Sequence, residues 1–458
     1  AVVTMYGLYA LHLTARERLV TSSTQLTRPR ILPLTTRALA TMHASLASKP
    51  MLQARRNHGC AFLNNTMVLA GGRHAPSIEV WDINTGRQEL VMADQPLLDI
   101  NHFQLLVVDK VVGMDAYNDP KGRRPGEDTA GSSPKEIWIP CGFVGSDVNS
   151  ETNSNHTVII DPDQGFSVRL GPRIDQPRGA CGALALDLDG PGAPQHICMF
   201  GGSIGAHDGG TFTKTVSCYD RVRQQWHRPL PHLPMPADHL NVVHIPAGVR
   251  CGDGESGPPS PERLMYFNFR DGTYATQRPE IFALDIKRDG QGRIVFDDDD
   301  TNNNDVVGGG WYLLGSSDQP SQATSPEFAW KSTRDAAGVE VSPSGRFVFT
   351  FGGVHYPRTD DADERSPKKL YNYAEVRAID VCTGTLIDMP DSTRMQAERF
   401  AVVTCRNANY RAVTCGGTNT ASHYTNLGSC DVHDLYDLEK MAFAAASSVQ
   451  SGGAALRA

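Results

Sequence analysis

The sequence predicts an all-β protein in which four-stranded antiparallel sheets stand in a ring around a central axis. The main observation is a repeat. Four segments each contain an Arg, a strand-like run that ends in Gly-Gly, and a later run that ends in Asp. A unit of about 50 residues with four short strands is typical of radially repeated sheets. The composition, with 43 Gly and 29 Pro, suits many tight turns. The Gly pairs are Gly71-Gly72, Gly201-Gly202, Gly352-Gly353 and Gly416-Gly417.

Reading along the chain, we expect six such units. The first runs from about Arg55 to Val91, with a hairpin turn at Asn64-Asn65. The second contains "INHFQLLVVDK" and "TVIIDPDQGFSVRL", lacks the Gly pair, and carries a polar insertion of residues 118–155 interrupted by "EIWIPCGFVG". The third is the most regular, and its Trp226 is expected to pack between units. The fourth is inferred from "LNVVHI", "RLMYFNF", "EIFALDI" and "WYLLGSS".

The last two units and the chain ends bear on how the ring closes. The fifth contains "FVFTFGG" and "AEVRAID", and the sixth "RFAVVTC", "YRAVTCGG", "SCDVHDL" and, as an outer strand, "KMAFAAA". We expect "LYALHLTARERLV" near the N-terminus to complete the last unit, which would remove two exposed edges. Residues 1–445 would then form one domain and residues 446–458 a flexible tail. A ring of seven units, with residues 1–50 in part of a separate unit, is the alternative.

With this repeat the chain resembles the kelch family of β-propellers, in the galactose oxidase/kelch-like superfamily. From about Leu98 to Gly290 it is most similar to secreted kelch proteins of the malectin-associated type. The stretches that carry this likeness are "INHFQ", "GPRIDQPRGACGA", "GGSIGAHDGG" and "LPMPADHLNVVH". The resemblance implies a kelch-type propeller with six blades, or alternatively seven, in an extracellular setting. It implies no defined activity, because such folds host many functions.

Cysteines and glycosylation sequons also favour an extracellular location. Cys405 and Cys415 flank a hairpin turn, and Cys181 and Cys198 flank a loop in another blade, so both pairs are disulfide candidates. The alternative is that they are small buried apolar residues. Sequons at Asn64 and Asn155 would lie on a hairpin turn and in the polar insertion. Disulfides and N-glycans together indicate an oxidising, secreted or cell-surface environment.

Net charge and hydropathy exclude several partners. The net charge is -8, and no Lys/Arg run is long enough to form a phosphate-binding face, so a nucleic-acid partner is not expected. The sequence lacks an apolar stretch of the length that spans a bilayer. The initial "AVVTMYGLYALHL" is interpreted as a strand that remains after a signal peptide has been removed.

One set of polar residues does not repeat from blade to blade and is therefore our candidate ligand-binding site. Equivalent positions in a propeller converge on one end or on the central channel, so these residues are expected to lie near one another. The alternative is that the His side chains bond loop backbone in the channel. The candidate residues are His102, Arg178, His207, Asp208, Asp238 and His239.

The residue pattern gives weak support to catalysis. A copper-radical oxidase needs two His, two Tyr and a Cys–Tyr cross-link, but Cys218 and Tyr219 are neighbours on one strand and point to opposite faces. A sugar hydrolase needs one selected pair of carboxylates, whereas Asp residues recur at equivalent turns here. The run Asp297–Asp300 is consecutive and cannot direct all four carboxylates at one ion. No metal and no cofactor are therefore predicted.

The sequence thus predicts a non-catalytic, extracellular interaction scaffold. Its partner would be another protein or a surface glycan within a larger assembly, bound by the long loops of the second and fourth blades. Two alternatives stay open. One is a copper-radical oxidase or another carbohydrate-active enzyme, and the other is an intracellular kelch adaptor.

Overall fold

The computed structural model describes residues 49–111, 134–145, 150–190, 195–205, 210–251, 258–271, 277–295, 310–316, 334–355, 371–419 and 426–455. The chain divides into two units, 1–44 and 45–458, and the description below concerns the second. Several predictions fall outside the described residues. These are the N-terminal strand expected to close the ring, the ligand candidates His207 and Asp208, and the run Asp297–Asp300.

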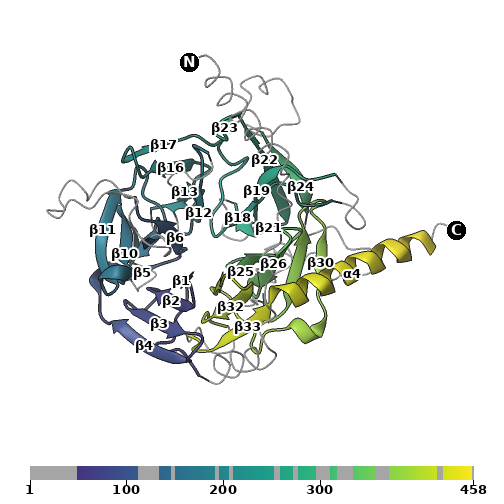
Figure 1. The fold of residues 1–458 in the computed structure, drawn as a ribbon. Helices are drawn as coiled ribbons and strands as arrows, with labels where there is room; N and C mark the ends of the chain where they lie inside the picture. Colours follow the sequence, from purple (N-terminus) through teal and green to yellow (C-terminus); the bar gives the residue numbers. More distant parts are fainter. Residues whose placement is uncertain are drawn as a thin grey trace, which may run out of the picture. The chain divides into compact units, whose positions relative to one another are not determined.

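Six antiparallel sheets, called blades 1 to 6 here, contain most of the described strands (Figure 1). Blade 1 consists of β1 (Gly59–Leu63), β2 (Thr66–Ala70), β3 (Ile78–Asp82) and β4 (Arg87–Met92). Blade 2 consists of β6 (Leu106–Asp109), β7 (Lys135–Ile139), β10 (His156–Asp161) and β11 (Ser167–Arg173). Blade 3 consists of β12 (Gly182–Leu186), β13 (His196–Phe200), β16 (Val216–Asp220) and β17 (Gln225–His227).

The second half of the chain forms three further blades. Blade 4 has β18 (Asn241–Ile245), β19 (Glu262–Phe267) and β22 (Glu280–Arg288), and both β23 (Ile294–Val295) and β24 (Trp311–Ser316) pair with β22. Blade 5 has β25 (Gly338–Val341), β26 (Phe347–Phe351), β29 (Val376–Asp380) and β30 (Leu386–Asp388). Blade 6 has three described strands, β31 (Val403–Arg406), β32 (Arg411–Cys415) and β33 (Cys430–Asp434).

Shorter elements lie in the connections. Small sheets pair β5 (Ile100–Asn101) with β8 (Phe143–Val144) and β9 (Thr152–Asn153), β14 (Ser203–Ile204) with β15 (Thr211–Phe212), β20 (Phe269–Arg270) with β21 (Gln277–Arg278), and β27 (Val354–His355) with β28 (Tyr371–Asn372). Short 3-10 helices span Pro96–Leu98, Pro162–Gln164 and Asp391–Thr393. Each small sheet follows the second strand of a blade, so these elements gather at one end of the blades.

The first strands of the blades contact one another in a closed cycle. β1 contacts β6, β6 contacts β12, and the contacts continue through β18, β25 and β31 back to β1. This is a β-propeller-like arrangement, in which each sheet covers the apolar face of the next. Between blades 3 and 4, for example, Phe200 packs in one cluster with Tyr266, Phe282 and Trp311.

Buried arginines explain the repeated Arg and Gly-Gly. The first Gly of each pair has a left-handed backbone, and its carbonyl oxygen accepts a hydrogen bond from a guanidinium Nη1. These bonds are 2.8 to 3.2 Å long, and each Arg is at most 2% exposed. The bonded pairs are Arg55 with Gly71, Arg178 with Gly201, Arg334 with Gly352, and Arg399 with Gly416.

The repeated Asp residues close turns at the other end of the blades. One carboxylate oxygen of Asp220 accepts hydrogen bonds from the backbone N–H groups of Val222 and Arg223, both at 2.8 Å. Asp82 and Asp434 likewise accept from the backbone N–H groups of the residues two and three positions after them. This is the local turn geometry that Asp favours.

All ten cysteines are disulfide-bonded, but the two predicted pairings are wrong. Cys405 lies opposite Val413 in the β31–β32 register, two positions from Cys415, so these two cysteines do not face each other. Cys181 precedes β12, and the residue of β12 opposite Cys198 is Leu184. The observed bonds are Cys60–Cys405, Cys141–Cys181, Cys198–Cys218, Cys251–Cys382 and Cys415–Cys430. The first joins blade 6 to blade 1 across 345 residues of sequence and so links the two ends of the described ring.

The end of the chain also differs from the prediction. "KMAFAAA" is not a strand but part of the helix α4 (Leu435–Ala455), which occupies most of the predicted tail (Figure 1). Leu435, Leu438 and Ala442 bury one side of α4 against Phe347 and Phe349 of blade 5. Ala, Leu, Met and Glu in this segment favour a helix over a strand. Among the described residues, no helix combines the length and apolar composition that a membrane crossing needs.

Candidate functional site

Six equivalent residues form a ring where the first strands of the blades begin, and we call it the mouth ring. All six have φ between 51° and 56°, in the left-handed region that non-Gly residues seldom adopt. At five described junctions the backbone N–H of one ring residue donates to the carbonyl oxygen of its counterpart in the preceding blade, at 2.9 to 3.2 Å. The ring residues are Asn57, His102, Ala180, His239, Ala336 and Ala401.

The repetition of this strained backbone shows that it belongs to the fold. Strained residues often mark active sites, but here the same φ recurs in every described blade, including three in which the residue is Ala. Chemistry at the mouth ring must therefore come from side chains that differ between blades. Asn57, His102 and His239 carry polar side chains there, so the sequence candidates His102 and His239 do come together.

A buried hydrogen-bond network holds His102. Its Nδ1 bonds Asn101 Oδ1, and its Nε2 lies 2.8 Å from Asn57 Nδ2. The amide of Asn101 donates to Glu151 Oε1 at 3.0 Å, and Glu151 forms an ion pair with Arg73 at 2.8 Å. Because Asn101 Oδ1 can only accept, this contact places a proton on Nδ1 of His102.

A second network holds His239 from the opposite side. Asp238 Oδ2 lies 2.9 Å from His239 Nδ1, and Arg270 bonds both carboxylate oxygens of Asp238, at 2.7 and 3.0 Å. Burial alone would raise the pKa of Asp238, but the nearby charges of His239 and Arg270 and their hydrogen bonds lower this pKa to about 2. The carboxylate is therefore ionised throughout the physiological range.

The two networks meet at the mouth ring. The His102 and His239 rings are 5.0 Å apart and nearly perpendicular, and Phe143 packs edge-on against His102 at 5.6 Å. Asp335 of blade 5 extends the second network, with an oxygen 3.5 Å from Arg270 Nε. Blades 1, 2, 4 and 5 thus contribute to one polar cluster of hydrogen-bond donors and acceptors.

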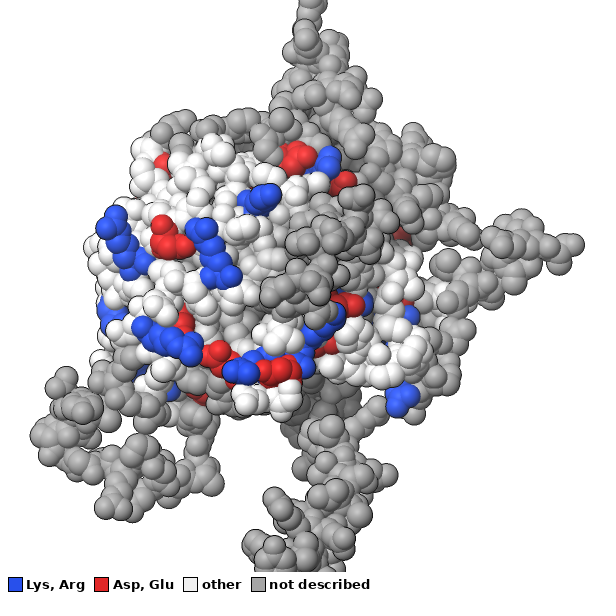
Figure 2. All heavy atoms as spheres, turned by 90° about the horizontal axis from the view of Figure 1, so that it is seen from above, with Lys and Arg blue, Asp and Glu red and all other residues white. Residues whose placement is uncertain are grey.

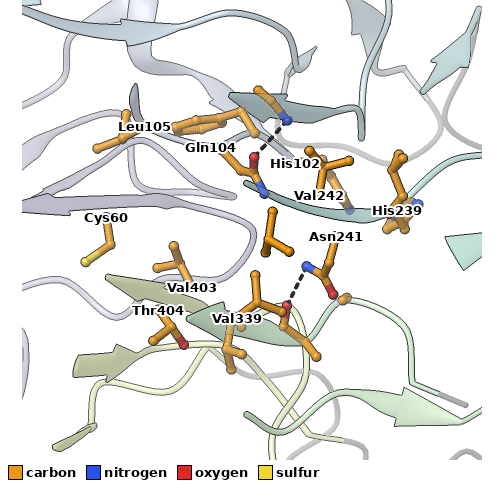
Figure 3. Close-up of a pocket in the computed structure, with 18 of the residues that line it drawn as sticks. Cys60, His102, Gln104, Leu105, His239, Asn241, Val242, Val339, Val403 and Thr404 are labelled. Carbon is orange, nitrogen blue, oxygen red and sulfur yellow. Dashed lines mark hydrogen bonds between the residues drawn. The ribbon is translucent and has the colours of Figure 1, made fainter. Parts of the chain in front are cut away.

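Beneath the mouth ring, the first strands enclose a cavity of about 430 Å³ (Figure 3). Its walls are largely apolar, with Leu105, Val242, Val339 and Val403 among the lining side chains. The polar side chains there bridge neighbouring blades. Gln104 Oε1 accepts from the N–H of Ala183 at 2.8 Å, and Asn241 Nδ2 donates to the carbonyl of Ala337 at 3.1 Å.

An ion pair lies farther down the cavity wall. Glu340 on β25 is 15% exposed and accepts from Arg406 Nε on β31 at 3.0 Å. Burial raises the pKa of Glu340 to about 7, although the Arg406 charge and hydrogen bond act in the opposite direction. This carboxyl group therefore changes its charge near neutral pH.

The other predicted site residues lie elsewhere. Arg178 is fully buried within blade 3, where it bonds Gly201, Thr215 and Ser217 as the counterpart of Arg55, Arg334 and Arg399. Its surroundings favour a structural role. Trp226 donates from Nε1 to the Arg173 carbonyl at 2.7 Å, between blades 2 and 3. The sequon residues Asn64 and Asn155 are both exposed, the first on the β1–β2 turn, and their glycosylation stays a prediction.

Sequence reasoning missed Asn57, Asn101, Arg270 and Glu340. Counting from the repeated Arg would have found Asn57, because in each blade that has this Arg the mouth-ring residue lies two positions after it. Arg270 had no such signal, since its link to Asp238 depends on a bridge between two loops that are distant in sequence.

The charged surface gives no sign of a polyanion-binding face on the side that Figure 2 shows. Lys and Arg side chains lie beside Asp and Glu along that surface, and most other described atoms are uncharged (Figure 2). This interspersed pattern agrees with the net charge of -8. A nucleic-acid site would need a patch of one sign.

Comparisons with known proteins bear on the fold alone. No protein-family model matches the sequence. No curated protein matches it significantly. Many solved structures are similar in fold, and one, described as "Structure of YjhT", aligns with a TM-score of 0.55 at 10% identity over 84% of this chain and 99% of its own. Similarity at that identity supports the shared all-β architecture and assigns no activity.

Proposed function

We propose that this chain is a six-bladed, kelch-type β-propeller that acts outside the cell as a non-catalytic interaction scaffold. It would bind another protein or a surface glycan within a larger assembly. The six described sheets and the buried Arg–Gly-Gly contacts support the kelch type and the blade number. A secreted or cell-surface location is compatible with the disulfides of the chain.

The observation that carries the proposal is covalent linkage between blades. Three of the five disulfides join neighbouring blades: Cys60–Cys405 joins blade 6 to blade 1, Cys141–Cys181 joins blade 2 to the segment entering blade 3, and Cys251–Cys382 joins blade 4 to blade 5. Such links form and persist in an oxidising compartment and fix the relative positions of the blades. A rigid ring suits a protein that presents a fixed binding surface.

The mouth ring and the small sheets around it are the binding face that we favour. The polar cluster of His102, Asp238, His239 and Arg270 provides several hydrogen-bonding groups beside an apolar cavity. Ligand sites combine such walls with a few convergent polar groups. The pairing of all ten cysteines argues against the copper-radical oxidase, because no thiol remains for a Cys–Tyr cross-link.

Cross-linking on intact cells and their extracellular matrix tests the proposal. We expect cross-links from the loops around the mouth ring to one partner in fixed stoichiometry, five disulfides in non-reducing peptide maps, and glycans on Asn64 or Asn155. Free thiols in a cytosolic fraction would support the adaptor instead. Recovery of an uncomplexed, unlinked monomer, or of stoichiometric copper with a modified Tyr, would refute the scaffold role.

A further inference from the structure

A second group of polar side chains lies in blade 3, at the end of its strands opposite the mouth ring. Asp189 follows β12, His196 begins β13 and Asp220 ends β16. The register pairs His196 with Leu186, the last residue of β12, which places all three residues far from Ala180 of the mouth ring. One ligand atom from each residue lies within 4.8 Å of the other two.

His196 is the unusual member of this group. It is 2% exposed, and neither ring nitrogen has a hydrogen-bond partner among the described residues. Its Nε2 lies 3.9 Å from Asp189 Oδ2 and 3.8 Å from Asp220 Oδ2, which is too far for a hydrogen bond. Buried polar atoms without partners are costly and rare.

His227 on β17, which is partly buried, lies beside it. The two imidazole rings are 5.2 Å apart, and His227 Nε2 is also buried without a hydrogen-bond partner in the described part of the chain. Cys218 and Asp220 lie on the same face of β16, and Cys218 is directly opposite His227 on β17. His227 is therefore the diagonal neighbour of Asp220, on the face of the sheet that carries His196. The ligand atoms of Asp189, His196 and Asp220 thus lie close together, and a second imidazole, His227, lies beside His196 on the same face of the sheet.

A cationic group already lies between the two carboxylates. Arg223 Nη1 is 2.8 Å from Asp220 Oδ2 and 3.7 Å from Asp189 Oδ2. Its side chain is 60% exposed, so it can move into solvent without breaking buried packing. The arrangement favours positive charge at this position, and a small cation could replace the guanidinium.

We propose that Asp189, His196, Asp220 and His227 bind one divalent transition-metal ion, of which Zn²⁺ is the simplest example. Imidazole nitrogen and carboxylate oxygen are the ligands that this class of ion accepts in four-coordinate sites. The ion would satisfy buried imidazole nitrogen atoms and tie the loop after β12 to three strands of blade 3. It would be a structural ion, separate from the polar cluster at the mouth ring.

The turn after β16 orients one of the ligands. The Oδ1 atom of Asp220 is held by the backbone N–H groups of Val222 and Arg223, which leaves Oδ2 directed toward His196.

The test uses the untagged full chain with its disulfides intact. Zn²⁺ is titrated against a chromophoric chelator, and calorimetry gives the stoichiometry. We expect one ion per chain, with an increase in the midpoint of thermal unfolding on binding. Asp189→Asn, at an exposed position, should weaken binding at least tenfold. Arg223→Gln, which removes the competing guanidinium, should tighten it by roughly two- to fivefold.

Two further variants make the test specific. Asp163→Asn removes a carboxylate that is 55% exposed at a turn of blade 2, and it should bind Zn²⁺ like the wild type. His196→Gln should abolish binding, with circular dichroism to check folding. The proposal is wrong if the wild type shows no saturable binding of one ion. It is equally wrong if Asp189→Asn keeps the wild-type affinity.

Discussion

Four of the described blades repeat one pattern, and two do not. Blades 1, 3, 5 and 6 have a buried Arg two residues before the mouth-ring position and a Gly pair after the second strand. In blades 2 and 4 the Arg is replaced by Ile100 and Ala237, and the Gly pair by Cys141-Gly142 and Asn268-Phe269. These two blades provide His102 and His239, the imidazoles of the polar cluster.

This difference separates residues that build the ring from residues that are free for another role. Where the Arg is present, its guanidinium bonds loop carbonyls in the same way each time. Where it is absent, Asn101 and Asp238, each next to the mouth ring, form networks that occur once. Repetition therefore marks scaffold, and its interruption marks the candidate site.

The largest expected loss of stability comes from removing the Cys60–Cys405 disulfide, which joins the regular blades 1 and 6. Replacing both cysteines by Ala should lower the free energy of unfolding by about 4–5 kcal/mol, because the bond closes a very long loop. Replacing Cys415 and Cys430, which close a loop of 15 residues, should cost about 3 kcal/mol. Guanidinium unfolding under non-reducing conditions measures both. Equal losses would mean that closure of the ring adds nothing.

A second prediction concerns the repeated Arg. Arg178→Ala leaves the buried carbonyl of Gly201 without the Arg178 donor and removes one of two donors to the Thr215 carbonyl, so it should cost about 3 kcal/mol in the same assay. The control Arg223→Ala, at a side chain that is 60% exposed, should change stability by about 0.5 kcal/mol or less. If Arg178→Ala behaves like this control, the Arg is not the structural element that we infer.

A third prediction concerns Asp238 in the irregular blade 4, whose ionisation should make the free energy of unfolding depend on pH. Its pKa is about 2 in the folded chain and 3.8 in the reference state, because His239 and Arg270 outweigh the effect of burial. The unfolded chain therefore takes up the proton first as the pH falls. The carboxylate stabilises the fold fully above about pH 4, and about 2 kcal/mol should be lost as the pH falls to about 2.

The difference in acid dependence between wild type and Asp238→Asn measures this contribution. The variant should show a flatter fall of unfolding free energy between pH 4 and pH 2. Asp163→Asn, which removes an exposed carboxylate, should keep the wild-type slope. Parallel curves for wild type and Asp238→Asn would contradict the ion pair at the mouth ring.

The smallest expected effect is a change of stability with pH that arises from Glu340 in the cavity wall. Glu340 has a pKa of about 7 against a reference of 4.5, so the native chain binds more protons than the unfolded chain between these values. Stability should then fall as the pH rises through this window. Relative to Glu340→Gln, the wild type should lose about 1 kcal/mol from pH 5 to pH 8, a value reduced by solvent in the cavity and by Arg406. If the difference in unfolding free energy between wild type and Glu340→Gln does not change with pH, Glu340 is solvated and this prediction is wrong.

The sequence alone predicted much of the fold and part of the site. Most strands of blades 1 to 5 and the Gly turns lie where the pattern placed them, because these features depend on neighbours within a few dozen residues. An exception is β7, which the sequence analysis placed within an insertion and which is the second strand of blade 2. His102, Asp238 and His239 also come together as expected. Arg270 and Glu340 were missed, since their partners lie on other loops or strands and leave no local spacing to read.

What the sequence determined was antiparallel strand order and turn geometry, since hydrophobic alternation and Gly or Asp at turns act locally. Only the tertiary structure decided which cysteines pair, that α4 forms where a strand was expected, and that Arg270 lies beside Asp238 at the mouth ring. Each of these depends on which surfaces the closed ring brings together. Cys60 and Cys405, for example, meet only because the first and last blades are adjacent.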